Sequence, residues 1–255
     1  NRKEEKKSYD LAGLVKANTV NQDIKSFRQT QLLLTDLIPA KKSANEYHNI
    51  IVRYEGRLLQ FVRKGELLRL KFSFRKLAKK IGMKVVAKNE NGEEVTSFYI
   101  SKMNDTWEYM PKKTGFLIFE LKPYANGMHI TSNRPGHGFI TPLTIYRYNC
   151  TVYFEAPPDL KQVTVKISVP ANAAVTAALY DASGKLQQKR ENMTGHQLLT
   201  AQQPAGAKPQ LWKLVLTKIS NTCAIALAAP LKPVLYTHPD NILKEEKRHE
   251  QKTEE

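Results

Sequence analysis

Aromatic side chains offer the clearest chemistry in this sequence. A ring face can stack on the C–H surface of a sugar while polar neighbours bind the hydroxyl groups. Trp107 and Tyr109 lie two residues apart before a proline turn, and Tyr124 and His129 follow on a later segment. These four residues are the candidate carbohydrate-binding set. The alternative, that Trp107 or Tyr109 simply caps a hydrophobic core, is favoured because large rings are mostly buried.

Catalytic motifs are missing from the sequence. It contains no GxSxG elbow, no HExxH pair, no GxxxxGK[ST] loop and no GxGxxG opening a helix. Glycoside hydrolysis needs two carboxylates that face each other across a cleft. The acidic candidates lie on expected strands or turns without a pairing signal: Glu108, Glu120, Glu155 and Asp159. We therefore expect no catalytic residues and no enzymatic activity.

No metal site or cofactor is expected either. The six histidines are scattered singly, and the two cysteines form no zinc pattern. Asn89, Asn91, Glu93 and Asp181 supply hard oxygens, but a calcium shell of roughly six to eight oxygens is difficult to assemble from them. His137 stands in the suggestive segment RPGHG. A tight connection between domains that needs positive φ at glycine is the favoured interpretation of that segment.

The formal charge of +16 raises the question of polyanion binding. A nucleic-acid binder usually concentrates its basic residues on one helix or stripe, whereas the positive excess here is spread along the chain. The densest run spans a strand, a loop and a second strand, and it consists of Arg75, Lys76, Lys79, Lys80, Lys84 and Lys88. A basic, soluble surface is the favoured interpretation. Electrostatic binding of acidic polymers, such as nucleic acid or sulfated glycan, through this run and Lys112 and Lys113 is the alternative, with nucleic acid the less expected partner.

Two cysteines stand near the two ends of the second half of the chain. If the strands that carry Cys150 and Cys223 are neighbours, a disulfide closing a loop of about 70 residues would stabilise the fold by several kcal/mol. Two buried free thiols are equally compatible with the sequence, because cysteine is a good small core residue.

The patterning predicts an all-β protein with a short N-terminal helical segment. Residues 22–38 have loosely helical apolar spacing that ends before Pro39. From residue 47 onward apolar and polar residues alternate with a period of two, which is typical of sheets wetted on one face. Further strands are expected at 83–87, 95–100, 116–121 and 128–132, separated by turn signals at 91–92, 113–115 and 126–127. Short strands at this spacing predict two tandem antiparallel β-sandwiches of jelly-roll type.

An internal repeat supports the division into two sandwiches. Residues 58–67 match 151–160, 84–95 match 176–187, 114–121 match 209–216 and 126–132 match 221–227, at offsets of 92 to 95. In this alignment Phe61 lies over Phe154, and Gly92 lies over Gly184. The expected organisation is an N-terminal extension at 1–44, a first sandwich at 45–143, a second at 144–238, and a charged tail at 239–255.

The same motifs resemble the pre-peptidase C-terminal type of bacterial β-sandwich. The likeness rests on FVRKGELLRLKF (61–72), the NxxG turn at 89–92, the segment around Trp107, PKKTG (111–115) and NGMHITS (126–132), and it extends over residues 45–243. The second half looks like the partner domain that accompanies such domains at the C-terminus of secreted, glycoside-hydrolase-like proteins. The resemblance implies an accessory role, an upstream hydrolase-like region in the same polypeptide and a secreted or cell-envelope location.

The leading functional interpretation is therefore a non-catalytic, carbohydrate-associated module. No apolar run reaches the roughly 18 residues that a membrane-spanning helix needs. A purely structural spacer without a ligand is the third interpretation, beside the polysaccharide and acidic-polymer hypotheses.

Overall fold

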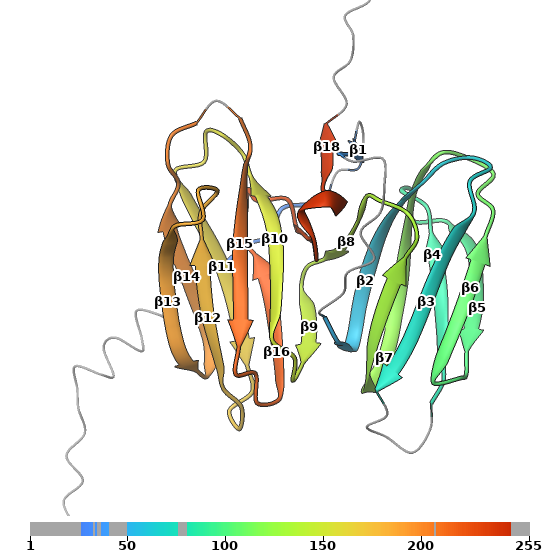
Figure 1. The fold of residues 1–255 in the computed structure, drawn as a ribbon, viewed down its shortest axis with the longest axis horizontal. Helices are drawn as coiled ribbons and strands as arrows, with labels where there is room; N and C mark the ends of the chain where they lie inside the picture. Colours follow the sequence, from blue (N-terminus) through green and yellow to red (C-terminus); the bar gives the residue numbers. More distant parts are fainter. Residues whose placement is uncertain are drawn as a thin grey trace, which may run out of the picture.

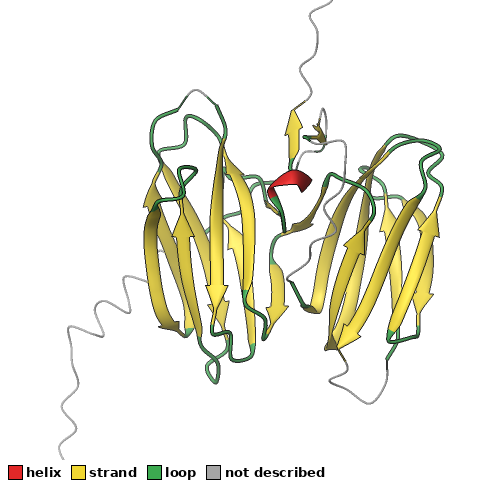
Figure 2. Ribbon diagram, in the orientation of Figure 1, coloured by secondary structure: helices red, strands yellow, loops and turns green. Residues whose placement is uncertain are grey.

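The computed structural model describes residues 27–32, 34, 37–40, 50–75, 81–206 and 208–245. Within these ranges the chain is antiparallel β-structure, with one 3-10 turn, η1 (Pro239–Asn241), and no α-helix. Two β-sandwiches lie side by side (Figures 1 and 2). The all-β sandwich class expected from the alternating pattern is confirmed.

The first sandwich contains two sheets that share one long strand. Its strands are β2 (Val52–Val62), β3 (Leu68–Arg75), β4 (Met83–Lys88), β5 (Glu94–Ile100), β6 (Asn104–Tyr109) and β7 (Gly115–Ser132). The second half of β7 pairs with β3, which pairs with β6. The first half of β7 pairs with β4, and β4 pairs with β5. A turn was expected at Asn126–Gly127, but β7 continues through both residues and bends from one sheet into the other instead.

The second sandwich repeats this arrangement. Its strands are β10 (Cys150–Ala156), β11 (Gln162–Val169), β12 (Val175–Tyr180), β13 (Leu186–Met193), β14 (Gly195–Gln202), β15 (Gln210–Thr217) and β16 (Thr222–Leu227). β10 and β12 flank β15 as β2 and β4 flank the first half of β7, and β13 follows β12 as β5 follows β4. β11 pairs with β14 and β16 as β3 pairs with β6 and the second half of β7. The two halves of the chain therefore share one pairing scheme.

One position in the repeat alignment is out of register. Phe154 is completely buried between the sheets of the second sandwich, whereas Phe61 packs in a separate cluster outside the first. The residues of β2 that point into the first sandwich are Leu58, Gln60 and Val62. A one-residue shift moves every side chain of a strand to the opposite face, so the apparent match of the two phenylalanines places opposite faces over each other.

Two equivalent Asx turns join β4 to β5 and β12 to β13. Asn89 Oδ1 accepts the backbone N–H of Asn91 at 3.0 Å, and Asp181 Oδ1 accepts that of Ser183 at 2.9 Å. Gly92 and Gly184 have φ of 81° and 82°, the left-handed region in which glycine costs least. The hairpin chemistry expected from the sequence is confirmed in both copies.

The two sandwiches are joined through strands as well as through side chains. β9 (Leu143–Tyr146) pairs with β16 of the second sandwich and meets β2 of the first. β8 (His137–Ile140) pairs with β2 and with β17 (Val234–Leu235), and Tyr236 bridges to Tyr153 on β10. Figure 1 shows β8 and β9 between the sandwiches. One cluster of buried apolar residues extends through both sandwiches, so the junction is part of the core.

The helix expected at residues 22–38 is wrong over the part that the structure describes. Residues 27–32 and 34 have no regular structure, and Leu37–Pro39 form strand β1, which pairs with β18 (Leu243–Glu245). Leu32, Leu34 and Leu37 pack against a second apolar cluster that includes Phe61 and Phe116. An extended segment can bury its apolar residues on that surface without a helical face, and this tertiary contact overrides the local spacing. Residues 22–26, 33, 35 and 36 lie outside the described residues.

The glycine-rich RPGHG segment forms a tight connection, as expected. Gly136 has φ of 70°, and a Cβ there would lie 2.6 Å from Cγ of Pro39. His137 is buried; its Nδ1 donates to the carbonyl of Arg134 at 2.9 Å, and its Nε2 lies 3.0 Å from the amide nitrogen of Asn241. The histidine therefore links the junction to η1.

No disulfide joins Cys150 and Cys223, because both are free thiols in the core of the second sandwich. Cys150 opens β10 and Cys223 lies on β16, and these strands belong to opposite sheets. Burial raises the pKa of Cys223 to about 12, and burial together with the nearby Cys223 raises that of Cys150.

We expect both thiols to be inert in the folded protein. The thiolate is the reactive form, and burial disfavours it in each case. An aromatic disulfide reagent at pH 8 should label neither cysteine in the native protein and both in denaturant, with and without prior reduction. Rapid labelling of the native protein would contradict the buried placement.

Candidate functional site

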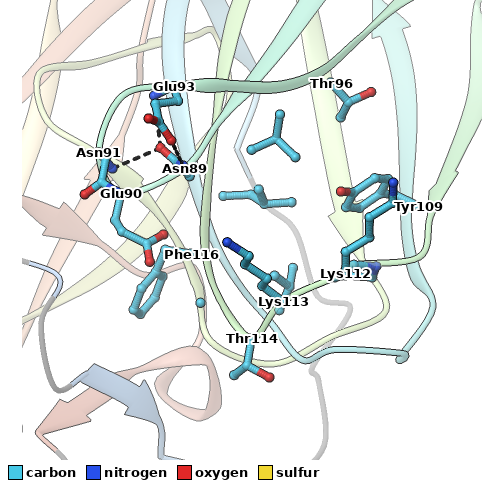
Figure 3. A pocket seen from close by; sticks show the side chains of 15 residues that line it. Asn89, Glu90, Asn91, Glu93, Thr96, Tyr109, Lys112, Lys113, Thr114 and Phe116 are labelled. Atoms are coloured by element: carbon cyan, nitrogen blue, oxygen red, sulfur yellow. Dashed lines mark hydrogen bonds between the residues drawn. The ribbon is translucent and has the colours of Figure 1, made fainter.

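A pocket of about 480 Å³ opens at one end of the first sandwich. Its walls are the turn between β4 and β5, the start of β5, the end of β6, and the segment that leads from Pro111 into β7. Figure 3 shows Tyr109 and Thr96 on one side, Asn89, Glu90 and Glu93 on the other, and Lys113 between them. Two stretches of the chain, 89–96 and 109–117, together with Val62 at the end of β2, thus face one concave surface.

Tyr109 supplies the aromatic surface of the pocket. Its ring lies parallel to that of Trp107, with centroids 5.3 Å apart, and Trp107 stacks in turn on Phe98 at 4.3 Å. Trp107 also packs edge-on against the buried Phe119. Because one face of Tyr109 rests on Trp107, the opposite face is the one available to a ligand. The stack of Phe98, Trp107 and Tyr109 therefore fixes the orientation of the Tyr109 ring relative to the core.

The β4–β5 turn builds the polar side of the pocket. Asn89 Oδ1 accepts the backbone N–H groups of Asn91 and Glu93, and its side-chain nitrogen donates to Glu93 Oε2 at 2.7 Å. The carboxylate of Glu90 lies directly over Gly115, where an added Cβ would be 3.1 Å from Oε1. The absence of a side chain at Gly115 therefore leaves room for Glu90 at the pocket.

The charges of the pocket are balanced. Glu90 and Glu93 face Lys112 and Lys113, and within the described part of the chain no ion pair involves Glu90, Lys112 or Lys113. The side chains of Glu90, Lys112 and Lys113 can therefore exchange hydrogen bonds with a ligand. A pocket with one ring face, two acceptors and two donors suits a neutral polyhydroxylated molecule.

The four aromatic and histidine candidates do not form one site. Trp107 and Tyr109 both pack against the core, the alternative that the sequence favoured, and Tyr109 also lines the pocket. Tyr124 is exposed at a bulge in β7, opposite Tyr54 of β2. His129 lies on the outer face of β7, edge-to-face with Tyr148 at 5.7 Å. Burial holds the pKa of His129 below its usual value, and Arg75 lowers it further, against a backbone hydrogen bond that raises it.

The predicted basic run is divided between two sheets. Arg75 ends β3 in one sheet, and Lys84 and Lys88 lie on β4 in the opposite sheet. Lys88 is paired with Glu120 at 2.7 Å. Lys76, Lys79 and Lys80 lie outside the described residues. Among the residues that are described, the run therefore forms no single stripe.

The acidic candidates have separate, mostly structural surroundings. Glu108 is paired with Arg69 at 2.6 Å, Glu120 with Lys88, Glu155 lies on β10, and Asp159 lies in the turn before β11. Nowhere in the described ranges do three or more potential metal ligands gather. No described helix is long and apolar enough to cross a membrane.

Sequence reasoning missed Glu90 and Thr96 as lining residues and gave Lys112 and Lys113 to a polyanion surface. Glu90 lies within the turn signal NENG, Thr96 follows it on β5, and Lys112 and Lys113 lie within the turn signal PKKTG. What the sequence could not supply is that these two turns meet at the same end of the sandwich. That proximity follows from the pairing of β4 with β7.

Fold and site together define an all-β protein of two repeated sandwiches with a ligand-sized pocket at one end of the first. No protein-family model matches the chain, and no curated protein matches it. Among solved structures, the chain is similar to the M60 catalytic domain with the CBM51-1 and CBM51-2 domains of Clostridium perfringens ZmpB, at a TM-score of 0.26 and 6% sequence identity. That similarity covers 78% of this chain and 38% of the other. The function of this chain therefore has to be argued from its own side chains.

Proposed function

We propose that this protein is a non-catalytic carbohydrate-binding module whose ligand site is the pocket at the end of the first sandwich. The observation that carries the proposal is the half-buried Tyr109 ring on the pocket wall, held by the stack on Trp107 and surrounded by charged side chains without ion-pair partners among the described residues. A ring face with convergent donors and acceptors is the usual composition of a sugar site. The pocket volume of about 480 Å³ is that of a small-ligand site.

A neutral sugar fits this pocket better than an acidic polymer does. Two carboxylates and two ammonium groups line it, so a polyanion would gain attraction from the lysines and meet repulsion from Glu90 and Glu93. Hydroxyl groups can accept from lysine and donate to carboxylate at the same time. Binding at this site should therefore depend only weakly on salt.

The wider setting of the module is also part of the proposal. The motif resemblance to pre-peptidase C-terminal type domains suggests an accessory region of an exported protein, attached to a hydrolase-like region of the same polypeptide. The module would then hold an enzyme on its polysaccharide and perform no chemistry itself.

Replacing Tyr109 with alanine should strongly weaken sugar retention. The change removes the stacking surface, and losing one such ring contact typically weakens binding by about tenfold or more. The measurement is retention of the protein on columns of neutral polysaccharides at about 50 and 500 mM salt, a range over which ionic binding collapses. Tyr99→Ala is the matched control, because Tyr99 is 60% exposed and does not line the pocket.

Glu90→Gln provides a second test without loss of buried area. It removes a charge that has no ion-pair partner among the described residues, so the fold should be unaffected while retention weakens. Both variants should be compared with the parent protein by thermal unfolding. If no neutral polysaccharide is retained, or if Tyr109→Ala and Tyr99→Ala behave alike, the pocket is not a sugar site.

A further inference from the structure

Three arginines gather on the outer face of the sheet where the two sandwiches meet. Arg53 on β2 and Arg75 on β3 are both partners of Gly127 on β7, one on either side. Arg147 follows β9, which meets β2 at Val52. Together with Tyr54, Tyr146, Tyr148 and His129, we call these residues the junction face.

Arg53 is held in place by aromatic rings and one amide. Its guanidinium carbon lies 4.4 Å from the ring centre of Tyr146 and 4.8 Å from that of Tyr54. One terminal nitrogen donates to Asn221 Oδ1 at 3.2 Å. Its Nε is buried and has no hydrogen-bond partner within the described residues. A buried donor without a partner costs free energy, so the Arg53 side chain is held here by its ring contacts, and its terminal nitrogens are the groups that a ligand could reach.

Arg147 is fixed by the same turn of the second sandwich. Its backbone N–H donates to the carbonyl of Asn221 at 2.8 Å, and its Nε donates to that of Ser220 at 2.7 Å. Its guanidinium carbon lies 5.5 Å from the ring centre of Tyr146. Two positive groups therefore flank one tyrosine ring.

The backbone at this face is strained. Arg147 has φ of 37° and Tyr54 has φ of 65°, a region that costs a bulky L-residue roughly 1–3 kcal/mol. Such outliers concentrate at functional sites. Here the two outliers lie at the residues that contact Arg53 and Tyr146.

The positive charge of the junction face is not neutralised. No carboxylate is paired with Arg53, Arg75 or Arg147 within the described part of the chain. On the same sheet face, Arg69 is paired with Glu108. An unneutralised guanidinium cluster is the arrangement that recognises carboxylate and sulfate groups.

We propose that the junction face is a second binding site, which takes the sulfate or carboxylate groups of an acidic polysaccharide. It is independent of the pocket, because Arg53 and the pocket residue Val62 lie at opposite ends of β2. The strand separates the two sites by roughly 25–30 Å.

The arrangement favours an acidic glycan over nucleic acid. Single-stranded nucleic acid needs free ring faces on which bases stack, whereas Arg53 covers one face of Tyr54 and of Tyr146, and Tyr148 is edge-to-face with His129. Duplex DNA is read by a helix or a two-stranded ribbon that enters a groove. The junction face is the surface of a broad sheet and offers neither.

The test is binding of the full chain to immobilised heparin, polygalacturonate and dextran, with a single-stranded DNA oligonucleotide as competitor. We expect heparin or polygalacturonate to bind at about 50 mM salt and to be released at 500 mM. Combining Arg53→Gln with Arg147→Gln should weaken binding about tenfold or more. Arg75→Gln, which removes no side-chain hydrogen bond between described residues, should weaken binding severalfold on its own.

Arg69→Gln is the control for overall charge. It removes one positive charge from the same sheet face, but that charge is already paired with Glu108, so affinity should change less than about twofold. Binding to heparin alone assigns sulfate, and binding to polygalacturonate alone assigns carboxylate. Equal losses in Arg69→Gln and Arg75→Gln, equal retention on dextran, or DNA that binds more tightly than either glycan would each overturn the proposal. Tyr109→Ala should leave this binding intact, which separates the junction face from the pocket.

Discussion

Leu199→Ala should destabilise both sandwiches together. Leu199 is completely buried on β14, the edge strand of the second sandwich farthest along the sheet from β2, and a buried Leu→Ala change costs about 3–5 kcal/mol. The first sandwich should lose the same free energy of unfolding, because one continuous apolar cluster and the pairing of β9 and β8 connect the two. Tandem domains joined by a linker would instead unfold separately.

The two tryptophans make this measurable. Trp107 reports on the first sandwich and Trp212, which is fully buried, on the second. In a Trp212→Phe background, urea unfolding followed by Trp107 fluorescence should move to a lower midpoint when Leu199→Ala is added. Leu186→Ala, at a position that is 45% exposed, should leave the midpoint nearly unchanged. A Trp107 transition that ignores Leu199→Ala would mean that the sandwiches are energetically independent.

The strands of this protein could be predicted because their signals are local. Alternation over residues 68–74 and the Asx–Gly turns at 89–92 and 181–184 are each complete within a few residues. The shared period of the two halves is also visible without a structure. Such features give the architecture, and they do not depend on what the other half of the chain does.

The exceptions depend on contacts between distant segments. β7 was divided at Asn126–Gly127 because that dipeptide usually marks a turn, yet the sheet on both sides continues through it. The N-terminal apolar spacing was interpreted as helical because the apolar surface formed by Phe61 and Phe116 is not visible in sequence. In both cases tertiary structure decided between local alternatives.

The candidate sites show the same division. Tyr109 was predictable as an aromatic residue before a turn, but Glu90 was not predictable as lining the same pocket, because strand pairing brings the two walls together. The junction face was still harder to predict from the sequence. Arg53, Arg147 and Asn221 are widely separated in sequence and are brought together where two strands from different sandwiches meet.

Stability should fall as the pH is lowered from 7 to 5, chiefly through His137. Burial lowers the pKa of His137 from 6.5 to about 4 in the folded protein, against a hydrogen bond to Arg134 that raises it. The unfolded chain therefore takes up a proton near pH 6.5 while the folded protein does not do so until near pH 4. Between these values the unfolded state binds more protons, so acidification favours unfolding. The full difference is worth about 3 kcal/mol, of which about 2 is lost by pH 5.

The measurement is the free energy of unfolding in urea at several pH values between 5 and 7. His137→Gln removes the titrating group, so its stability should be lower at pH 7, where a buried hydrogen bond is lost, but should vary less with pH. His129→Gln is the control, because it removes a different histidine whose pKa is also lowered but which is only partly buried. The His129→Gln variant should keep most of the pH dependence of stability.

Between pH 5 and 7, the change in stability with pH comes from the histidines and not from carboxylates with lowered pKa values. Asp181 and Glu191 also have lowered pKa values, but stabilisation from a lowered carboxyl pKa is lost only below the unfolded values of 3.8 and 4.5. A parent protein and His137→Gln variant with equal slopes between pH 5 and 7 would show that His137 is accessible to protons in the folded state. Because His137 contacts Asn241 of η1, its protonation in the folded protein near pH 4 should also release the β1–β18 pair, and amide exchange there should accelerate before exchange in β2.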